Sequence, residues 1–323
     1  MAAVDIIIPL YNKEDTVARA VQSVIDQTFT DWHLIIVDDG STDNSLQVAR
    51  QYDDPRIRII EQDNRGPGAA RNRGIEEATA EYLAFLDADD QWYPFYLDNA
   101  LKAMKQSDAA FVGSMYDEWP AQTDMTAYWA KRNVHPGNYK LTGGEHPKEV
   151  LAKLFFFHVG NSVVHTEIAR QYGGFYDEGK CLLGEDTVFF AKLIFNERFT
   201  IIGPTAVRHN RQNSDLSNLK NRPLDIFLKR PEVVLDHCRG EKKNRAQKVL
   251  SWHALRVAHF RARNGYKDEA VYLREKFPMM RRYRFLYYKL GIEIRFSRWL
   301  PYWIRLKCRI AVVLKKIAKQ SEV

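Results

Sequence analysis

The chain of 323 residues is 45% hydrophobic with a formal charge of +7, so it is long and apolar enough to bury a full core. Its three cysteines, Cys181, Cys238 and Cys308, form no C-x-x-C pair, which disfavours a zinc ribbon or a disulfide framework and favours a reducing compartment. The opening apolar run is too short for a signal sequence and no stretch approaches the roughly 18 apolar residues of a spanning helix, so we expect a cytoplasmic protein.

The first part of the chain alternates β-rich runs with helical patterns, which predicts an α/β fold with a mostly parallel sheet flanked by helices. Strands are predicted over residues 4–10, 33–38, 57–62, 82–87 and 109–113. We expect Asn12 to cap the first helix, Ser41 or Asp43 to start the second, and Gly66-Pro67 to open the third. Because ligands of open α/β sheets lie beyond the carboxyl ends of the strands, the polar ends of strands one, two and four should meet in one crevice.

The remainder divides into a less regular and a helical part. Residues 117–144 are rich in Trp, Tyr, Asn, Gly and Pro with weak periodicity, which predicts a long loop or irregular insertion. Order returns over 145–219, with a helix at 147–156, a strand at 160–165 and a helix that begins near Glu185; beyond Arg222 the pattern is helical. We therefore expect one domain over 1–220, built from parts 1–115 and 116–220, followed by a basic helical region over 221–323.

Carboxylates gather where the fourth predicted strand ends. Asp87, Asp89 and Asp90 follow its apolar residues directly, and like charges so close together are unfavourable unless a cation neutralises them. Oxygen ligands suit Mg²⁺ or Mn²⁺, which commonly bind through one or two carboxylates and substrate phosphates. A metal diphosphate is therefore one interpretation, and a solvated turn that caps a helix is the alternative.

Three other segments are expected at the same edge of the predicted sheet. Asp39 follows strand two and suits hydrogen bonding to a base or ribose, although Ser41 and Asp43 beside it suit capping. Tyr11 follows strand one, where its ring either stacks on a nucleobase or joins the core. The run Asn64–Arg73 combines a glycine-rich helix start with Arg71, as phosphate binding needs, but its spacing and position disfavour a nicotinamide site.

Four motifs in this order, IIIPLYNKE, VDDGSTDNS, NRGPGAARNRG and FLDADD, closely resemble family 2 glycosyltransferases of the GT-A fold. The resemblance covers roughly residues 4–217, because GGFYD at 173–177 and GEDT at 184–187 resemble the acceptor-side segment of that family. It implies an inverting transfer of a sugar from a nucleoside-diphosphate donor, with UDP favoured, to a hydroxyl of a glycan or lipid-linked glycan. In these terms 1–115 is the nucleotide-sugar-binding part and 116–220 the acceptor-side part.

The same resemblance implies a role for each motif residue. Donor contacts are expected from Pro9, Tyr11, Glu14, Asp39, Arg71, Asp87 and Ala88. Asp89 would bind the divalent metal, Mn²⁺ or Mg²⁺, and His209 is a further metal candidate although its surroundings depart from the usual pattern. The pair Glu185-Asp186 would supply the general base, for which we choose Asp186; the alternative is an acidic first turn that favours the helix dipole.

Positive charge collects at the end of the chain. From residue 281 on, twelve lysines and arginines stand against only Glu293 and Glu322. Over 299–319 apolar and basic residues fall on opposite helical faces, which predicts a basic amphipathic helix on an anionic membrane surface, peripheral on the inner face of the cell membrane. An ordinary helix that packs on the catalytic domain is the alternative. Nucleic acid is not expected as a partner because no recognised module is present, and a non-catalytic nucleotide- or glycan-binding protein is the rival function.

Overall fold

The computed structural model describes residues 2–212 and 223–297. The chain forms two compact units, Met1–Arg245 and Ala246–Val323, and the predicted domain boundary at residue 220 stays a prediction. The division of 1–220 into a donor part and an acceptor part stays a prediction.

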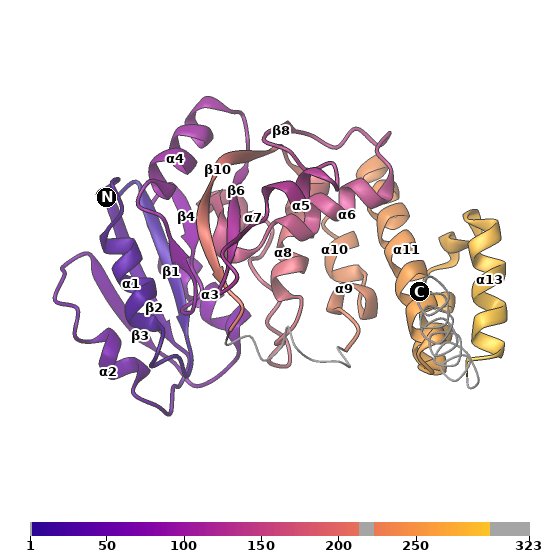
Figure 1. Ribbon diagram of the computed structural model, residues 1–323, viewed down its shortest axis with the longest axis horizontal. Coiled ribbons are helices and arrows are strands. Elements are labelled where there is room, and N and C mark those ends of the chain that lie inside the picture. Colours follow the sequence, from indigo (N-terminus) through magenta and orange to yellow (C-terminus); the bar gives the residue numbers. More distant parts are fainter. Residues whose placement is uncertain (1, 213–222, 298–323) are drawn as a thin grey trace, which may run out of the picture. The chain divides into compact units, whose positions relative to one another are not determined.

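A ten-stranded sheet forms the centre of the first unit (Figure 1). Its first half is parallel in the order β3-β2-β1-β4, with β1 at Val4–Leu10, β2 at Trp32–Asp38, β3 at Ile57–Glu61 and β4 at Tyr82–Phe85. Strands β1, β2 and β4 are mostly apolar runs, and β1 and β4 are almost wholly buried, as strands covered on both faces are. Their carboxyl ends therefore meet at one edge of the sheet.

The second half of the sheet is mixed. Beyond β4 the order continues β9-β6-β10-β5, with β9 at Ser162–His165, β6 at Phe111–Trp119, β10 at Phe199–Asn210 and β5 at Gln91–Trp92. Strand β9 runs antiparallel to both β4 and β6, while β10 runs parallel to β6. The short strands β7 (Thr123–Asp124) and β8 (Gly137–Tyr139) pair with β6 and β10.

Helices cover both faces of this sheet. The helices are α1 (Val17–Ile25), α2 (Ser45–Ala49), α3 (Pro67–Glu77), α4 (Tyr96–Gln106), α5 (Thr126–Ala130), α6 (Pro147–Phe156), α7 (Thr166–Gln171), α8 (Glu185–Asn196), α9 (Ile226–Lys229) and α10 (Glu232–Leu235). Helix α3 packs on β1 and β2, and Gly74 permits this close approach because a Cβ there would meet Ile7 Cγ2 at 2.5 Å.

Several sequence expectations need correction. Asn12 does not cap α1, which begins at Val17; it adopts a positive φ of 50° and accepts a hydrogen bond from the Thr42 N–H at 2.8 Å. Residues 117–144 are not an irregular loop, since they hold the end of β6 and also β7, α5 and β8. Strand β10 was not predicted at all, although it lies inside the sheet between β6 and β5.

The described residues of the second unit are helical, as predicted. Helix α11 (Gly240–Arg263) runs into this unit, and α12 (Lys267–Lys276), a 3₁₀ turn at Pro278–Arg282 and α13 (Arg284–Arg295) follow. Among the residues that the structure describes, no helix is both long and apolar enough to cross a bilayer. The amphipathic helix predicted over 299–319 lies outside the described residues.

Candidate functional site

A cleft of about 500 Å³ opens beyond the carboxyl ends of β1, β2, β3 and β4. This is the edge at which an open α/β sheet binds its ligands. The lining comes from the strand ends, the start of α3 and the chain up to the first residue of α8. It consists of Pro9, Leu10, Tyr11, Lys13, Asp39, Asn64, Gly66, Pro67, Ala70, Arg71, Asp87, Ala88, Asp89, Lys180, Leu182 and Glu185. The predicted convergence of polar strand ends is thus present.

Asp39 shapes the wall of the cleft between β2 and α3. Its buried carboxylate accepts hydrogen bonds from the backbone N–H groups of Arg65 and Gly66 and from the Gln62 amide, each at 2.8 Å. These bonds fix the loop that opens α3, where Gly66 has a φ of 93° that favours glycine. Asp39 therefore holds the loop backbone while it also borders the cleft.

The start of α3 lies directly against the segment that precedes α8. A Cβ at Gly68 would meet the Tyr176 carbonyl oxygen at 2.3 Å, so only glycine allows this contact. Asn72 locks the same segment, since its Nδ2 donates to the Phe175 oxygen at 2.9 Å and its Oδ1 accepts from the Phe175 N–H at 2.8 Å. Helix α3 and the segment before α8 are thereby fixed to each other.

Arg71 lies buried at this junction and pairs with two carboxylates. One guanidinium nitrogen lies 2.7 Å from Asp87 Oδ1 and another lies 2.9 Å from Glu185 Oε1. Burial opposes its charge, but Asp87 and Glu185 outweigh this and raise the pKa of Arg71 above its ordinary value. The guanidinium therefore ties the end of β4 to the first turn of α8.

Asp186, next to Glu185 in the first turn of α8, has an unusual ionisation. Burial, and then the negative charge of Glu185, raise the pKa of Asp186 from 3.8 to about 7, against the opposing effect of Arg71. Its Oδ1 accepts a hydrogen bond from the Thr187 N–H at 2.6 Å. A carboxylate with this pKa both holds and releases a proton near neutral pH, as a general base must.

Asp89 pairs with a lysine that sequence reasoning missed. The Lys13 ammonium donates to Asp89 Oδ2 at 2.6 Å, with both side chains at the cleft. Burial, Asp90 and Asp87 raise the pKa of Asp89, and Lys13 partly offsets them. Lys13 lies inside the motif IIIPLYNKE, so its place near the site was visible in the sequence, but its partner 76 residues away was not.

Asp90 turns away from the cleft toward β10. Its Oδ1 accepts from the Asn210 N–H at 2.8 Å, and its Oδ2 lies 2.9 Å from His209 Nδ1. Together with His158 these groups place three possible ligand atoms within 4.8 Å of one another. Burial lowers the pKa of His158 well below its ordinary value, so its ring is neutral. His209, predicted as a further metal candidate, is thus paired with Asp90, and nothing in the sequence singled out His158.

The chain is similar to proteins of a known family. A family model described as Glycosyl transferase family 2 matches residues 5–173. The chain belongs to this family. A relative from Rhizobium meliloti, the succinoglycan biosynthesis protein ExoW, is 41% identical over 266 residues, which cover 76% of this chain and 81% of ExoW. The predicted family is therefore confirmed.

Two further comparisons bear on the extent of the likeness. The uncharacterized glycosyltransferase YibD of Escherichia coli is 44% identical over 116 residues, or 35% of this chain, and the match spans about a third of YibD, 33%. The crystal structure of residues 1–349 of S. aureus TarS in complex with UDP-GlcNAc has a TM-score of 0.72 and 17% identity, and covers 94% of this chain and 92% of that one. This likeness shows the fold, and the predicted GT-A fold is confirmed.

Most of the residues predicted for the donor site of this glycosyltransferase line the cleft, and three predicted residues lie elsewhere. Pro9, Tyr11 and Ala88 border it along with the residues above, and the Tyr11 side chain is 46% exposed, so it is not a core residue. Glu14 does not line the cleft; its Oε2 accepts from the Asn44 N–H at 2.9 Å at the start of α2. Asp186 and His209 also lie outside the lining.

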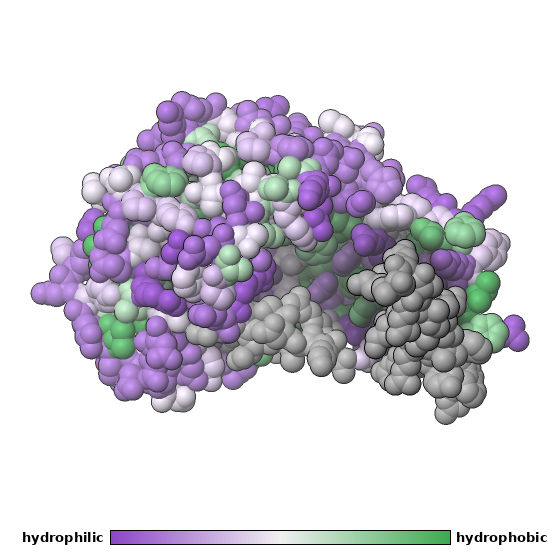
Figure 2. Space-filling model, in the orientation of Figure 1, coloured by the Kyte–Doolittle hydropathy of each residue, from purple (hydrophilic) through white to green (hydrophobic). Residues whose placement is uncertain are grey.

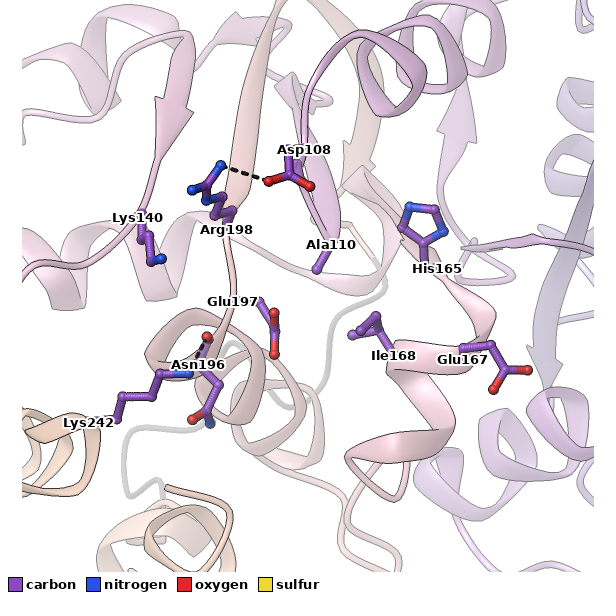
Figure 3. A pocket seen from close by; sticks show the side chains of 11 residues that line it. Asp108, Ala110, Lys140, His165, Glu167, Ile168, Asn196, Glu197, Arg198 and Lys242 are labelled. Carbon is purple, nitrogen blue, oxygen red and sulfur yellow. Dashed lines mark hydrogen bonds and ion pairs between the residues drawn. The ribbon is translucent and has the colours of Figure 1, made fainter. Parts of the chain in front are cut away.

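A second hollow of about 630 Å³ lies at the opposite edge of the sheet of the glycosyltransferase (Figure 3). It is bordered by the residues that precede β6 and β10. Two interactions join residues of its lining, since Arg198 lies 2.7 Å from Asp108 and the Lys242 ammonium donates to the Asn196 oxygen at 2.8 Å. No predicted site residue lines it, and the smaller cleft is the candidate active site.

Proposed function

We propose that this family 2 protein is an inverting glycosyltransferase that moves a sugar from a nucleoside-diphosphate donor, with UDP favoured, to a hydroxyl group of a glycan or lipid-linked glycan. The observation that carries the proposal is the Arg71 junction, where one buried guanidinium bonds both Asp87 and Glu185. It joins the end of β4, where the donor is expected, to the helix that carries Asp186.

The donor contacts are proposed from the cleft lining. Tyr11 offers an exposed ring for stacking on the base, and Asp39 lies between the ends of β2 and β3, where it would meet the nucleoside. Asp87 and Ala88 would face the ribose and diphosphate. Glu14 supports this pocket from behind by holding Asn44 at the start of α2.

Asp186 is proposed as the general base. It would take the proton from the acceptor hydroxyl as the hydroxyl oxygen forms a bond to the anomeric carbon, and the bond from that carbon to the diphosphate would break with its electron pair leaving on the nucleoside diphosphate. A single displacement of this kind inverts the anomeric configuration and needs no covalent enzyme intermediate. General-base assistance contributes about 10²–10⁴-fold to the rate.

A divalent metal, Mn²⁺ or Mg²⁺, is proposed at Asp89 with Asp87 nearby. The residues fit such an ion, because the carboxylates of Asp87 and Asp89 both line the cleft, although the ion would have to displace the Lys13 ammonium from Asp89. The ion would stabilise negative charge on the leaving diphosphate. His209 is the second metal candidate and would act with Asp90 and His158, whose ligand atoms lie together outside the cleft lining.

The substrate classes are supported by what similar proteins are named for. ExoW is named for succinoglycan biosynthesis, a glycan, and the TarS structure carries UDP-GlcNAc. We extend these to a UDP-sugar donor and a glycan acceptor, with the enzyme peripheral on the inner face of the cell membrane. The rival, a non-catalytic nucleotide- or glycan-binding protein, would not need a carboxylate poised near neutral pH as Asp186 is.

The test combines a panel of nucleotide sugars with three variants. Binding is followed by calorimetry with Mn²⁺ or Mg²⁺, and donor hydrolysis and sugar transfer by release of the nucleoside diphosphate. Asp89→Ala should abolish metal-dependent donor binding, whereas His209→Ala should leave it intact if the ion sits at Asp89. Asp186→Asn should bind donor and lose transfer by about 10²-fold or more. Asp108→Asn, at the opposite edge of the sheet, is the matched control and should behave as wild type.

Two results would refute this proposal. If no nucleotide sugar binds with either metal, the donor-site assignment fails. If Asp186→Asn transfers sugar at the wild-type rate, Asp186 is not the base.

A further inference from the structure

Helix α13 presents a hydrophobic stripe to solvent. Phe285, Tyr288, Ile292 and Phe296 are 77%, 72%, 62% and 51% exposed. Their spacing of three and four residues puts all four on one helical face. Figure 2 shows hydrophobic residues, in green, at the right-hand edge over α13. Contiguous exposed apolar surface of this kind marks an interaction site rather than ordinary surface.

The exposure does not arise because α13 is undocked. Its other face is buried within the second unit through Leu290 and Ile294. Glu293 on that face is buried as well, and accepts a hydrogen bond from the Arg263 guanidinium at 2.8 Å. The helix is therefore apolar on two faces, of which only one contributes to the core of its unit.

Basic side chains flank the exposed stripe. At helical spacing Lys289 lies on one side of it and Arg284 and Arg295 lie on the other. Arg281 and Arg282, just before the helix, are exposed too. The one acidic residue of 278–297 is Glu293, which faces inward and is already paired. The outer face is consequently apolar along its centre and positive at its borders.

We propose that this face of α13 is a docking surface for an anionic lipid bilayer. The aromatic and aliphatic side chains would enter the headgroup region, and the flanking arginines and lysine would meet lipid phosphates. Each basic residue near such a surface strengthens the attraction to anionic lipid.

Charge favours lipid over the two other occupants of this face. A second copy would bring one positive border against another. Residues 298–323 carry seven lysines and arginines against Glu322 alone, so as an occupant they too would add like charge. An anionic bilayer neutralises these charges. It would also carry the proposed lipid-linked acceptor, so the purpose of this surface rests on the proposed function.

The test uses the full chain with Phe285→Ser, Tyr288→Ser and Ile292→Ser combined. These side chains are exposed, so the fold should survive. A matched control replaces three exposed aromatic residues of the first unit, Phe95, Tyr128 and Phe155, with serine. Each protein is sedimented with vesicles of phosphatidylcholine containing phosphatidylglycerol, and with vesicles of phosphatidylcholine alone, while nucleotide-sugar binding is measured separately.

We expect wild type and the control to bind the anionic vesicles and the α13 variant to bind at least about tenfold more weakly, with donor binding unchanged. Added salt should weaken the binding of wild type, since the attraction is partly electrostatic. Equal binding by the α13 variant and wild type overturns the inference. Failure of the wild type to bind anionic vesicles overturns it too. If the α13 variant no longer self-associates in light scattering but still binds lipid as wild type does, the inference is overturned in favour of a second copy as the occupant. Because donor binding is read independently, failure of the lipid surface and failure of the proposed function are distinguishable.

Discussion

Replacement of Asp186 by asparagine should stabilise the glycosyltransferase while it stops sugar transfer. Ionised Asp186 is disfavoured in the folded protein, because burial and Glu185 raise its pKa from 3.8 to about 7. A group whose folded pKa is raised in this way opposes folding once it ionises in the unfolded chain, so stability is lost as pH rises from about 4 through 7. At about 1.4 kcal/mol per pKa unit, the stability lost to Asp186 is at most about 4 kcal/mol at pH 8 and about 2 kcal/mol at pH 5.

Asparagine carries no charge and its Oδ1 can still accept from the Thr187 N–H, so we expect it to recover about 1–3 kcal/mol at pH 8 and less at pH 5. Thermal melts of wild type and Asp186→Asn at several pH values give this difference, which should appear as a rise of several degrees in Tm.

Glu185→Gln is the matched control with the opposite sign. It removes a charge that lies 2.9 Å from the buried Arg71, and loss of one partner of a buried ion pair should cost more stability than the relief of the repulsion between Glu185 and Asp186 returns. The reasoning is refuted if Asp186→Asn melts at or below wild type at pH 8, or if its difference from wild type does not change with pH.

Three further predictions concern Asp186, Gly68 and Asp39. The kcat/KM of the wild type should rise with pH up to about 7 and then level, since Asp186 must be ionised to accept a proton; a profile flat from pH 5 to 8 would contradict this. Gly68→Ala should cost about 1–3 kcal/mol of stability, because its Cβ would lie 2.3 Å from the Tyr176 oxygen, whereas Gly144→Ala, with only Thr142 Oγ1 at 3.9 Å, should melt as wild type. Asp39→Ala should weaken nucleotide binding and cost about 1–3 kcal/mol by leaving the Arg65 and Gly66 N–H groups unpaired, as calorimetry and denaturant titration would reveal.

The first half of the fold was predictable because three of its four strands, β1, β2 and β4, are almost wholly apolar. The run at 4–10 forms β1 with the predicted limits. The predicted helix at Pro147–Phe156 is α6, also with the predicted limits. Strand β10 was missed because Gly203-Pro204 interrupts its pattern, and proline and glycine normally argue against a sheet interior. The structure accommodates the interruption through a shift of register between Ile202 and Val207, so the strand continues to pair with β6 on both sides.

The site was predictable to the extent that it depends on strand ends. Residues that follow β1, β2 and β4 line the cleft because parallel strands end at one edge. The bonds between distant segments were not predictable in the same way. Arg71 and Glu185 are 114 residues apart, and only the packing of α3 against the segment before α8 brings them together.

The acidic turn after β4 illustrates the difference. From the sequence, three nearby carboxylates required a cation, and a metal ion was the natural candidate. In the structure each has a cationic or ionisable partner from a separate element: Asp87 pairs with Arg71 at 2.7 Å, Asp89 with Lys13 at 2.6 Å, and Asp90 with His209 at 2.9 Å. Because these partners lie in different directions, the four-residue turn sends Asp87 and Asp89 toward the cleft and Asp90 toward β10. The three carboxylates are therefore each paired with a side chain of the protein itself. A metal ion at Asp89 has to compete with the Lys13 ammonium for the same carboxylate.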